Sequence, residues 1–165
     1  MVSMRNRYLL SISLAGLTLI AAGCKKTATY STRDGSVTVE QKGNDASSMT
    51  FSSKDGKSVT MNVGGDKIPD DYPKDLPVYP GAKVMVTQSL SEKNARTLML
   101  ESTDPADKIA EFYKKGFESN GWKIENTMTS GEMNIFTAAK ENRQAVLQIM
   151  NGGDKRTINQ VISDK

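Results

Sequence analysis

The sequence predicts an α+β fold: an antiparallel sheet covered on one face by a single amphipathic helix, and preceded by two tandem β-hairpins. Three observations lead to this class. Two N-terminal segments alternate polar and apolar residues around Asp-Gly, one later segment has a helical period, and four strand-like runs follow it. Short turns between those runs require antiparallel neighbours, so the later elements have the order ββαββββ.

Two similar segments, 29–39 and 50–61, form the N-terminal part of this pattern. In each, an aromatic and a basic residue precede Asp-Gly, and an alternating Val-Thr run follows. Asp-Gly between alternating runs indicates a hairpin, because glycine accepts the positive φ of a tight turn. The side chains expected to point inward are Tyr30, Val37, Val39, Phe51, Val59, Met61 and Val63. These are too few for an independent core, so the hairpins either pack on the following domain or form a loosely ordered stalk.

A proline-rich segment, residues 68–81, separates the hairpins from the rest of the chain. It contains Pro69, Pro73, Pro77 and Pro80. Proline fixes φ and disfavours helix before it, so an extended, semi-rigid strap is expected. The predicted organisation is a signal peptide at 1–23, a tether with two hairpin repeats at 24–67, the strap at 68–81, and an α+β domain at 82–165.

The best-defined element of that domain is one amphipathic helix. Asp104 suits the N-cap, Pro105 the first helical position, and Asn120-Gly121 a left-handed C-terminal cap. Its apolar stripe consists of Ala106, Ile109, Phe112, Tyr113 and Phe117. Two strands are expected before the helix, within 84–101, and four after it, within 122–128, 133–140, 145–150 and 157–162. In the first of these four, Trp122, Ile124 and Met128 are expected to face inward.

The start of the chain has the pattern of a secretory signal peptide. Arg5 and Arg7 precede an uncharged stretch from Tyr8 to Ile20, and small residues then lead to Cys24, the only cysteine. A basic start, a short apolar middle and a small-residue exit are typical of such a peptide. A transmembrane helix is the alternative. Spanning a bilayer takes about 20 mostly apolar residues, whereas this stretch is diluted by serine, threonine and glycine.

Residues 17–24 resemble the lipobox of bacterial lipoprotein precursors. The resemblance implies cleavage between Gly23 and Cys24, acylation of Cys24 by palmitate-like chains, and a membrane partner reached through those chains. It also implies an extracytoplasmic position in a bacterial cell envelope. Lys25 in place of aspartate favours the outer membrane, facing the periplasm. A single cysteine forms no internal disulfide, and acylation accounts for an otherwise odd thiol.

Composition excludes several chemistries. The chain contains no histidine, and its one cysteine is used by the anchor, which excludes Ser-His-Asp and Cys-His catalysis and His/Cys zinc sites. The precursor has 22 basic and 19 acidic side chains, and loss of Arg5 and Arg7 leaves 20 and 19, a balance of +1. No basic cluster is interleaved with aromatic residues, so no nucleic-acid partner is expected. No cofactor and no metal site are expected either.

Other acidic and methionine residues have structural explanations. Asp104 and Asp107 match a helix start better than an acid–base pair. Asp70-Asp71 lacks the spacing of a calcium loop. Met128 and Met133 fit flexible core filling better than Cu(I) binding.

A second resemblance covers most of the larger domain. Residues 76–84, Leu-Pro-Val-Tyr-Pro-Gly-Ala-Lys-Val, and the pair Phe112-Tyr113 with Gly121-Trp122 resemble a recurring module of bacterial envelope lipoproteins. That family has no assigned activity, so the resemblance implies no functional residues.

Together these patterns predict a lipid-anchored envelope lipoprotein that is not an enzyme and acts as a binding or assembly module. The partner is an unidentified envelope protein or glycan, and the candidate contact residues are Tyr72, Tyr79 and Trp122. For Trp122, core packing is favoured over partner binding, because it begins an inward-facing series. Two other functions remain open: a carboxylate-based hydrolase of cell-wall glycan, which needs two facing carboxyl groups, and a purely structural spacer.

Overall fold

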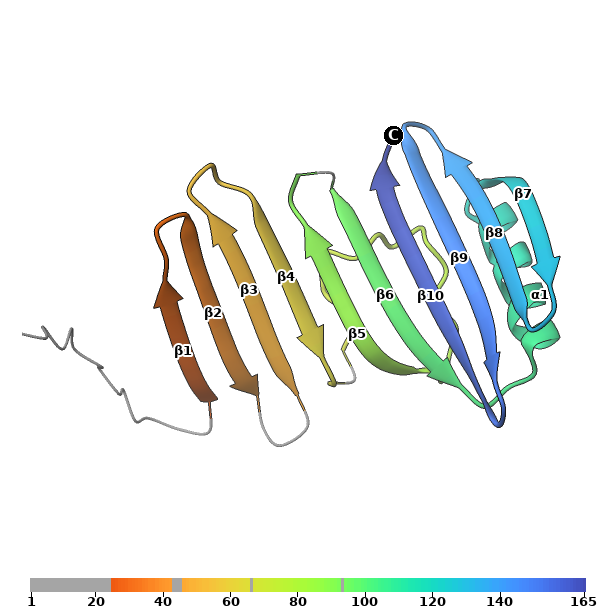
Figure 1. Cartoon of the computed structure of the whole chain (residues 1–165). Helices are drawn as coiled ribbons and strands as arrows, with labels where there is room; N and C mark the ends of the chain where they lie inside the picture. The colour runs from red at the N-terminus through yellow and green to blue at the C-terminus, as the bar shows by residue number, and fades with distance from the viewer. Residues whose placement is uncertain (1–24, 43–45, 66, 93) are drawn as a thin grey trace, which may run out of the picture.

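The computed structural model describes residues 25–42, 46–65, 67–92 and 94–165. These residues form ten strands and one helix (Figure 1). The elements are β1 (Lys25–Ser31), β2 (Gly35–Lys42), β3 (Ser47–Ser53), β4 (Ser58–Val63), β5 (Lys83–Leu90), β6 (Ala95–Ser102), α1 (Ala106–Ser119), β7 (Lys123–Ser130), β8 (Met133–Lys140), β9 (Arg143–Gly152) and β10 (Lys155–Asp164).

All ten strands belong to one antiparallel sheet, in the order β1-β2-β3-β4-β5-β6-β10-β9-β8-β7. The predicted α+β class is therefore wrong: the described residues are nearly all sheet, with one helix of 14 residues among them. The hairpins form, but they are not a preceding unit. β4 pairs with β5 from Val59↔Leu90 to Val63↔Val86, so the hairpins continue the sheet of the larger domain. A free strand edge is a template for such pairing, which needs no core of its own.

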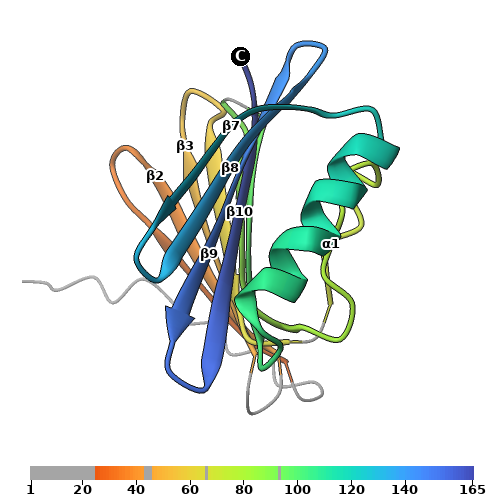
Figure 2. The same ribbon diagram turned by 90° about the vertical axis from the view of Figure 1, so that its right-hand side faces the viewer.

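The helix and the strap lie on the same face of the sheet (Figure 2). Helix α1 connects β6 to β7, which forms the far edge of the sheet. Its buried residues are Ile109, Ala110, Tyr113 and Phe117, the stripe that packs on the sheet. The helix ends as expected, because Gly121 has a φ of 75° and the Trp122 N–H donates to the Phe117 carbonyl at 2.8 Å. The N-cap is Pro105 rather than Asp104, and no side chain caps this end.

The strap, residues 68–81, contributes side chains to the core. Tyr72, Leu76 and Tyr79 are buried in one cluster with the helix stripe and with Leu98, Leu100, Phe136, Leu147 and Ile158 of the sheet. Strap and helix approach closely: a Cβ added to Gly116 would lie 2.7 Å from the Pro77 Cβ. The buried Gln160 side chain of β10 donates to the Pro77 carbonyl at 2.8 Å. The strap is therefore fixed against both the helix and the sheet.

Register assigns each strand residue to one of two faces, because directly opposite residues point the same way. Leu98, which is fully buried, is opposite Thr87, and the same row continues through Asn62 and Ser48. This row lies on the face of the sheet that α1 and the strap cover over β5–β10, and the whole of this face is called the covered face below. The neighbouring row contains Met99, Val86 and Val63 and lies on the other face, which is called the bare face below.

Candidate binding surface

The bare face carries an apolar patch over β1–β5. Three rows of directly opposite residues build it. The first row runs from Tyr30 on β1 to Leu90 on β5, the second from Ala28 on β1 to Met61 on β4, and the third from Val63 on β4 to Val86 on β5. The patch consists of Ala28, Tyr30, Val37, Val39, Met49, Phe51, Val59, Met61, Val63, Val86 and Leu90. Alternation along the hairpin strands places every second residue here.

These side chains remain open to solvent. The exposed fraction is 63% for Tyr30, 47% for Val63, 44% for Phe51, 38% for Met49 and 37% for Met61. The sequence correctly indicated that Tyr30, Phe51, Met61 and Val63 share a face, but the expectation that this face points inward is wrong. The helix and strap cover the opposite side, and a contiguous exposed apolar surface of this kind indicates an interaction site.

The covered face of the same strands is polar. Thr29 and Thr38 hydroxyls lie 3.1 Å apart, and those of Thr50 and Thr60 lie 3.3 Å apart. Further along, the Asn62 side-chain amide donates to the Thr87 hydroxyl at 3.0 Å. In the hairpin half of the sheet the apolar side chains therefore lie on the bare face, whereas in the half beneath α1 they lie on the covered face.

Methionine is concentrated on the bare face. The residues involved are Met49, Met61, Met99, Met128, Met133 and Met150. Met49 lies opposite Met61, and Met133 opposite Met150. The core role expected for Met128 is wrong, since it is 48% exposed. Unbranched thioether side chains adapt to the shape of what they contact, which suits a docking surface.

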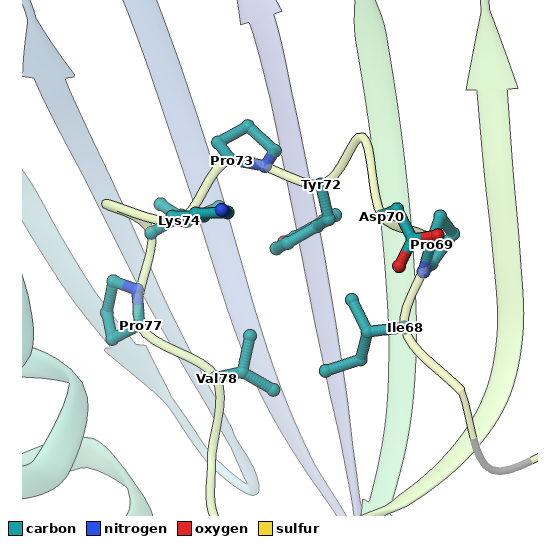
Figure 3. Close-up of a pocket in the computed structure, with 9 residues that line it drawn as sticks. Ile68, Pro69, Asp70, Tyr72, Pro73, Lys74, Pro77 and Val78 are labelled. Carbon is teal, nitrogen blue, oxygen red and sulfur yellow. The ribbon is translucent and has the colours of Figure 1, made fainter.

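A separate hollow lies within the loop of the strap (Figure 3). Its volume is about 460 Å³, and its lining residues are Ile68, Pro69, Asp70, Tyr72, Pro73, Lys74, Leu76, Pro77 and Val78. Asp70 is the one carboxylate among them. The Tyr72 hydroxyl is buried without a hydrogen-bond partner among the described residues, and burial raises the pKa of this phenol above its usual range. Because the hydroxyl is covered, a ligand in the hollow reaches mainly proline rings and aliphatic carbon.

The three predicted partner-binding residues lie in the core. Tyr72, Tyr79 and Trp122 are 7%, 5% and 2% exposed. The Tyr79 hydroxyl donates to Asp104 at 2.6 Å, and burial together with this carboxylate raises the pKa of Tyr79 to about 12. The Trp122 indole N–H donates to the Asp75 carbonyl at 2.9 Å. Their role in partner binding stays a prediction, and the contacts described here join strap, helix and sheet.

Asp75 forms the main ionic contact of the strap. Its carboxylate accepts from Lys140 at 2.8 Å and from two nitrogens of Arg143 at 2.7 and 3.0 Å. The Arg143 guanidinium, with help from Lys140, lowers the pKa of Asp75 to about 2. Arg143 also lies over the Trp122 ring, 5.1 Å from its centroid. This cluster fastens the strap to β8 and β9.

Other acidic candidates are engaged in local contacts. Asp104 accepts from Tyr79 and from Lys108, and these two hydrogen bonds lower its pKa. Asp71 accepts from Arg96 at 2.8 Å. Within the described ranges, no group of three or more His, Cys, Asp or Glu is arranged to hold a metal ion.

The predicted cleavage and lipidation residues, Gly23 and Cys24, lie outside the described residues, which begin with β1 at Lys25. In the part of the chain that the structure describes, no helix has the length and apolarity needed to cross a membrane.

Comparison with known proteins gives one partial match. A family model described as START domain-like matches residues 83–156, which is less than half of the chain. The matched region runs from β5 into β10 and includes α1, but leaves out β1–β4 and the strap. No curated protein and no solved structure matches the chain.

Proposed function

We propose that this protein is a lipid-anchored lipoprotein of a bacterial envelope that acts as a non-catalytic binding or assembly module through the apolar patch of β1–β5. The observation that carries the proposal is the patch itself: aromatic, aliphatic and methionine side chains that neither helix nor strap covers. Exposing such a surface is unfavourable in water, and a partner that covers it removes that cost.

The anchor gives the patch a location. Cys24 directly precedes β1, so acyl chains on its sulfur would hold the edge strand within one or two residues of the bilayer surface. Ala28 and Tyr30 of this strand belong to the patch. A partner embedded in or resting on the same membrane would therefore meet the patch without a search through solution. The outer membrane, facing the periplasm, is the proposed site.

The START domain-like match agrees with a binding role in general, since domains of that type are typically binding folds. It does not select the apolar patch, because β1–β4 lie outside the matched residues. In the matched region, the space between helix and sheet is filled by Tyr113, Phe117 and Phe136, each no more than 1% exposed. The bare face is therefore the better supported surface for a partner.

The hydrolase alternative has less support. A retaining or inverting glycosidase needs two carboxyl groups facing each other across a substrate cleft. The hollow of the strap is lined by Asp70 alone among carboxylates. A spacer role is the remaining alternative, and it requires no partner on the patch.

The experiment is mild crosslinking of the full-length protein in its own envelope, with labelled fatty acid as a second readout. Met61→Glu places a charge on the bare face, whereas Thr60→Glu places the same charge on the covered face one residue away. We expect Met61→Glu to lose the crosslinked complexes and Thr60→Glu to keep them. Equal complexes in both variants would show that the patch is not the binding surface, and recovery of no crosslinked partner from the wild type would support the spacer. Fatty acid should label the wild type and not Cys24→Ser; label in the mutant would refute acylation at Cys24.

A further inference from the structure

We infer that the occupant of the apolar patch is a second copy of this chain, packed face to face so that two β1–β5 layers form a sandwich. This inference rests on the proposed function, since it names the partner of that same surface. Four features of the described residues lead to it: the charge of the patch, its surroundings, its area and the position of the chain start.

The patch is uncharged. The positions that complete its rows are Gln41, Ser47 and Gln88, and charges appear only at its margin, with Lys26 on the edge strand and Lys83 at the start of β5. After loss of Arg5 and Arg7, the whole chain has 20 basic and 19 acidic side chains. Two copies therefore bring neither a repulsive face nor a large net charge into contact.

The surroundings argue against a bilayer as the occupant. A peripheral membrane surface combines apolar side chains with a basic rim that meets anionic headgroups. At the turns beside the patch the charges are mixed. Asp34 follows Arg33, and Lys57 pairs with Glu92 at 2.9 Å and with Asp55 at 3.7 Å. A small molecule is also a poor fit, because such ligands bind in concave pockets and the patch is the face of an open sheet.

The area is sufficient for a sandwich. Five strands about 4.8 Å apart, with about seven residues each at about 3.3 Å, give a face of roughly 550 Å² per copy. Two such faces bury roughly 1,100 Å², above the ~1,000 Å² expected of a specific interface. Sheets pack in this way at a separation of about 10 Å with strands nearly aligned. Anchoring both copies to one membrane raises their effective concentration and favours the contact further.

The middle strand of the patch provides its centre. In β3, Phe51 lies between Val37 and Val59, which are directly opposite it on the neighbouring strands. A two-fold axis parallel to the strands and above β3 places each Phe51 against its symmetry mate, and β2 of one copy above β4 of the other. Phe51 is then the aromatic anchor of an isologous interface.

The position of Lys25, at the start of β1, favours this axis over one that lies across the strands. Rotation about an axis parallel to the strands leaves the Lys25 ends of both β1 strands at the same end of the sandwich. Both Cys24 residues then reach one bilayer. An axis lying across the strands would place the two anchors at opposite ends, where one membrane does not hold both.

The test uses the full-length, anchored protein in its own membranes and a short bis-maleimide. Phe51→Cys places a thiol on the proposed axis, and Met49→Cys is a second variant on the same face of β3. Thr50→Cys is the matched control, because it lies between them and faces the opposite side. Wild type sets the background from any Cys24 that is not acylated, because an acylated sulfur does not react with a maleimide. We expect dimers of this chain at least tenfold more abundant for Phe51→Cys and Met49→Cys than for Thr50→Cys.

The other outcomes overturn the inference. Equal dimer yields at positions 50 and 51 mean random collision on the membrane. Absence of dimers above the wild-type background in both bare-face variants also rules out the sandwich. If thiols at 49 and 51 crosslink only to a different polypeptide, the second copy is wrong while the proposed binding function stands. If no product forms and Met61→Glu also changes nothing, the binding function fails as well.

Discussion

The two halves of the sheet have the same backbone pairing and opposite burial. In the half formed by β5–β10, apolar side chains such as Leu98 and Leu147 point toward α1 and the strap and are fully buried. In β1–β4 the apolar side chains, such as Phe51 and Val63, point to the other face and remain exposed. In these strands, Thr50 and Asn62 occupy the covered face, on which the core lies in the other half.

This contrast shows that strand pairing and core formation are separable in one sheet. Backbone hydrogen bonding between β4 and β5 extends the sheet regardless of which face carries the apolar side chains. A β-bulge between Val84 and Val86 moves the apolar residues of β5 from the covered face to the bare face. Burial then depends on which face a helix or strap covers, and the hairpins have no such cover.

The largest expected effect compares one phenylalanine in each half. Phe117 of α1 is fully buried, so Phe117→Ala should destabilise the fold by about 3–5 kcal/mol through the cavity it leaves. Phe51→Ala should cost less than about 1 kcal/mol, because this ring is 44% exposed. Urea unfolding of both variants, at a concentration too low for self-association, measures the difference. Similar losses in the two variants would mean that something covers the bare face within one chain.

Hydrogen exchange should separate the halves without any substitution. Amides of β9 and β10 lie in the middle of the packed half, whereas β1 is an edge strand whose side chains from Lys26 to Ser31 are exposed. Local opening of β1–β2 should therefore be easier, with exchange roughly a hundredfold faster than in β10. Mass spectrometry of peptides from each strand reports this ratio. Uniform protection across all ten strands would contradict two halves of different stability.

Removing the ionic contact of the strap should have an intermediate effect. Asp75→Asn leaves Lys140 and Arg143 without their carboxylate, and we expect a loss of about 2 kcal/mol at pH 7. The pKa of Asp75 is lowered from 3.8 to about 2, so its contribution is present above about pH 4 and is lost as the pH falls toward 2.

Unfolding at pH 7 and at pH 3 measures this effect, and the variant should lose less stability on acidification than the wild type. Asp71→Asn is the control. Its ion pair with Arg96 is half-exposed on the carboxylate side and should contribute no more than about 0.5 kcal/mol. An equal effect of the two substitutions would show that the strap is not fastened at Asp75.

The smallest expected effect on stability comes from substitutions in turns. Each half of the sheet has a turn in which a glycine adopts a positive φ. Gly121 and Gly56 have φ of 75° and 83°, so valine at either position is strained by about 1–2 kcal/mol. Gly121→Val should lower global stability by more than about 1 kcal/mol, because this turn positions Trp122. Gly56→Val, in the β3–β4 turn, should mainly increase local opening of the hairpin. Denaturation together with hydrogen exchange distinguishes the two, and a neutral Gly121→Val would mean that the helix ends elsewhere.

Several elements could be predicted from sequence because their signals are local. Both hairpins form beside the Asp-Gly pairs, and the helix stops at Asn120-Gly121. The expected positive φ is present at Gly56 but not at Gly35, which is the first residue of β2. Of the three residues expected to face inward near the start of β7, Trp122 and Ile124 do so. Met128 does not, because a bulge between Ile124 and Asn126 reverses the alternation. No composition signal at Glu125 indicates that bulge. Acylation of Cys24, and the location that follows from it, stay predictions.

What the sequence determined by itself was the position of turns, the amphipathic stripe of α1 and the alternation of each hairpin strand, since these follow from φ preferences and side-chain periodicity within a few residues. Which face of each strand became core was decided only by the tertiary structure. That choice depends on where Tyr79 of the strap and Phe117 of the helix come to lie on strands distant in sequence, and no local pattern records such a contact.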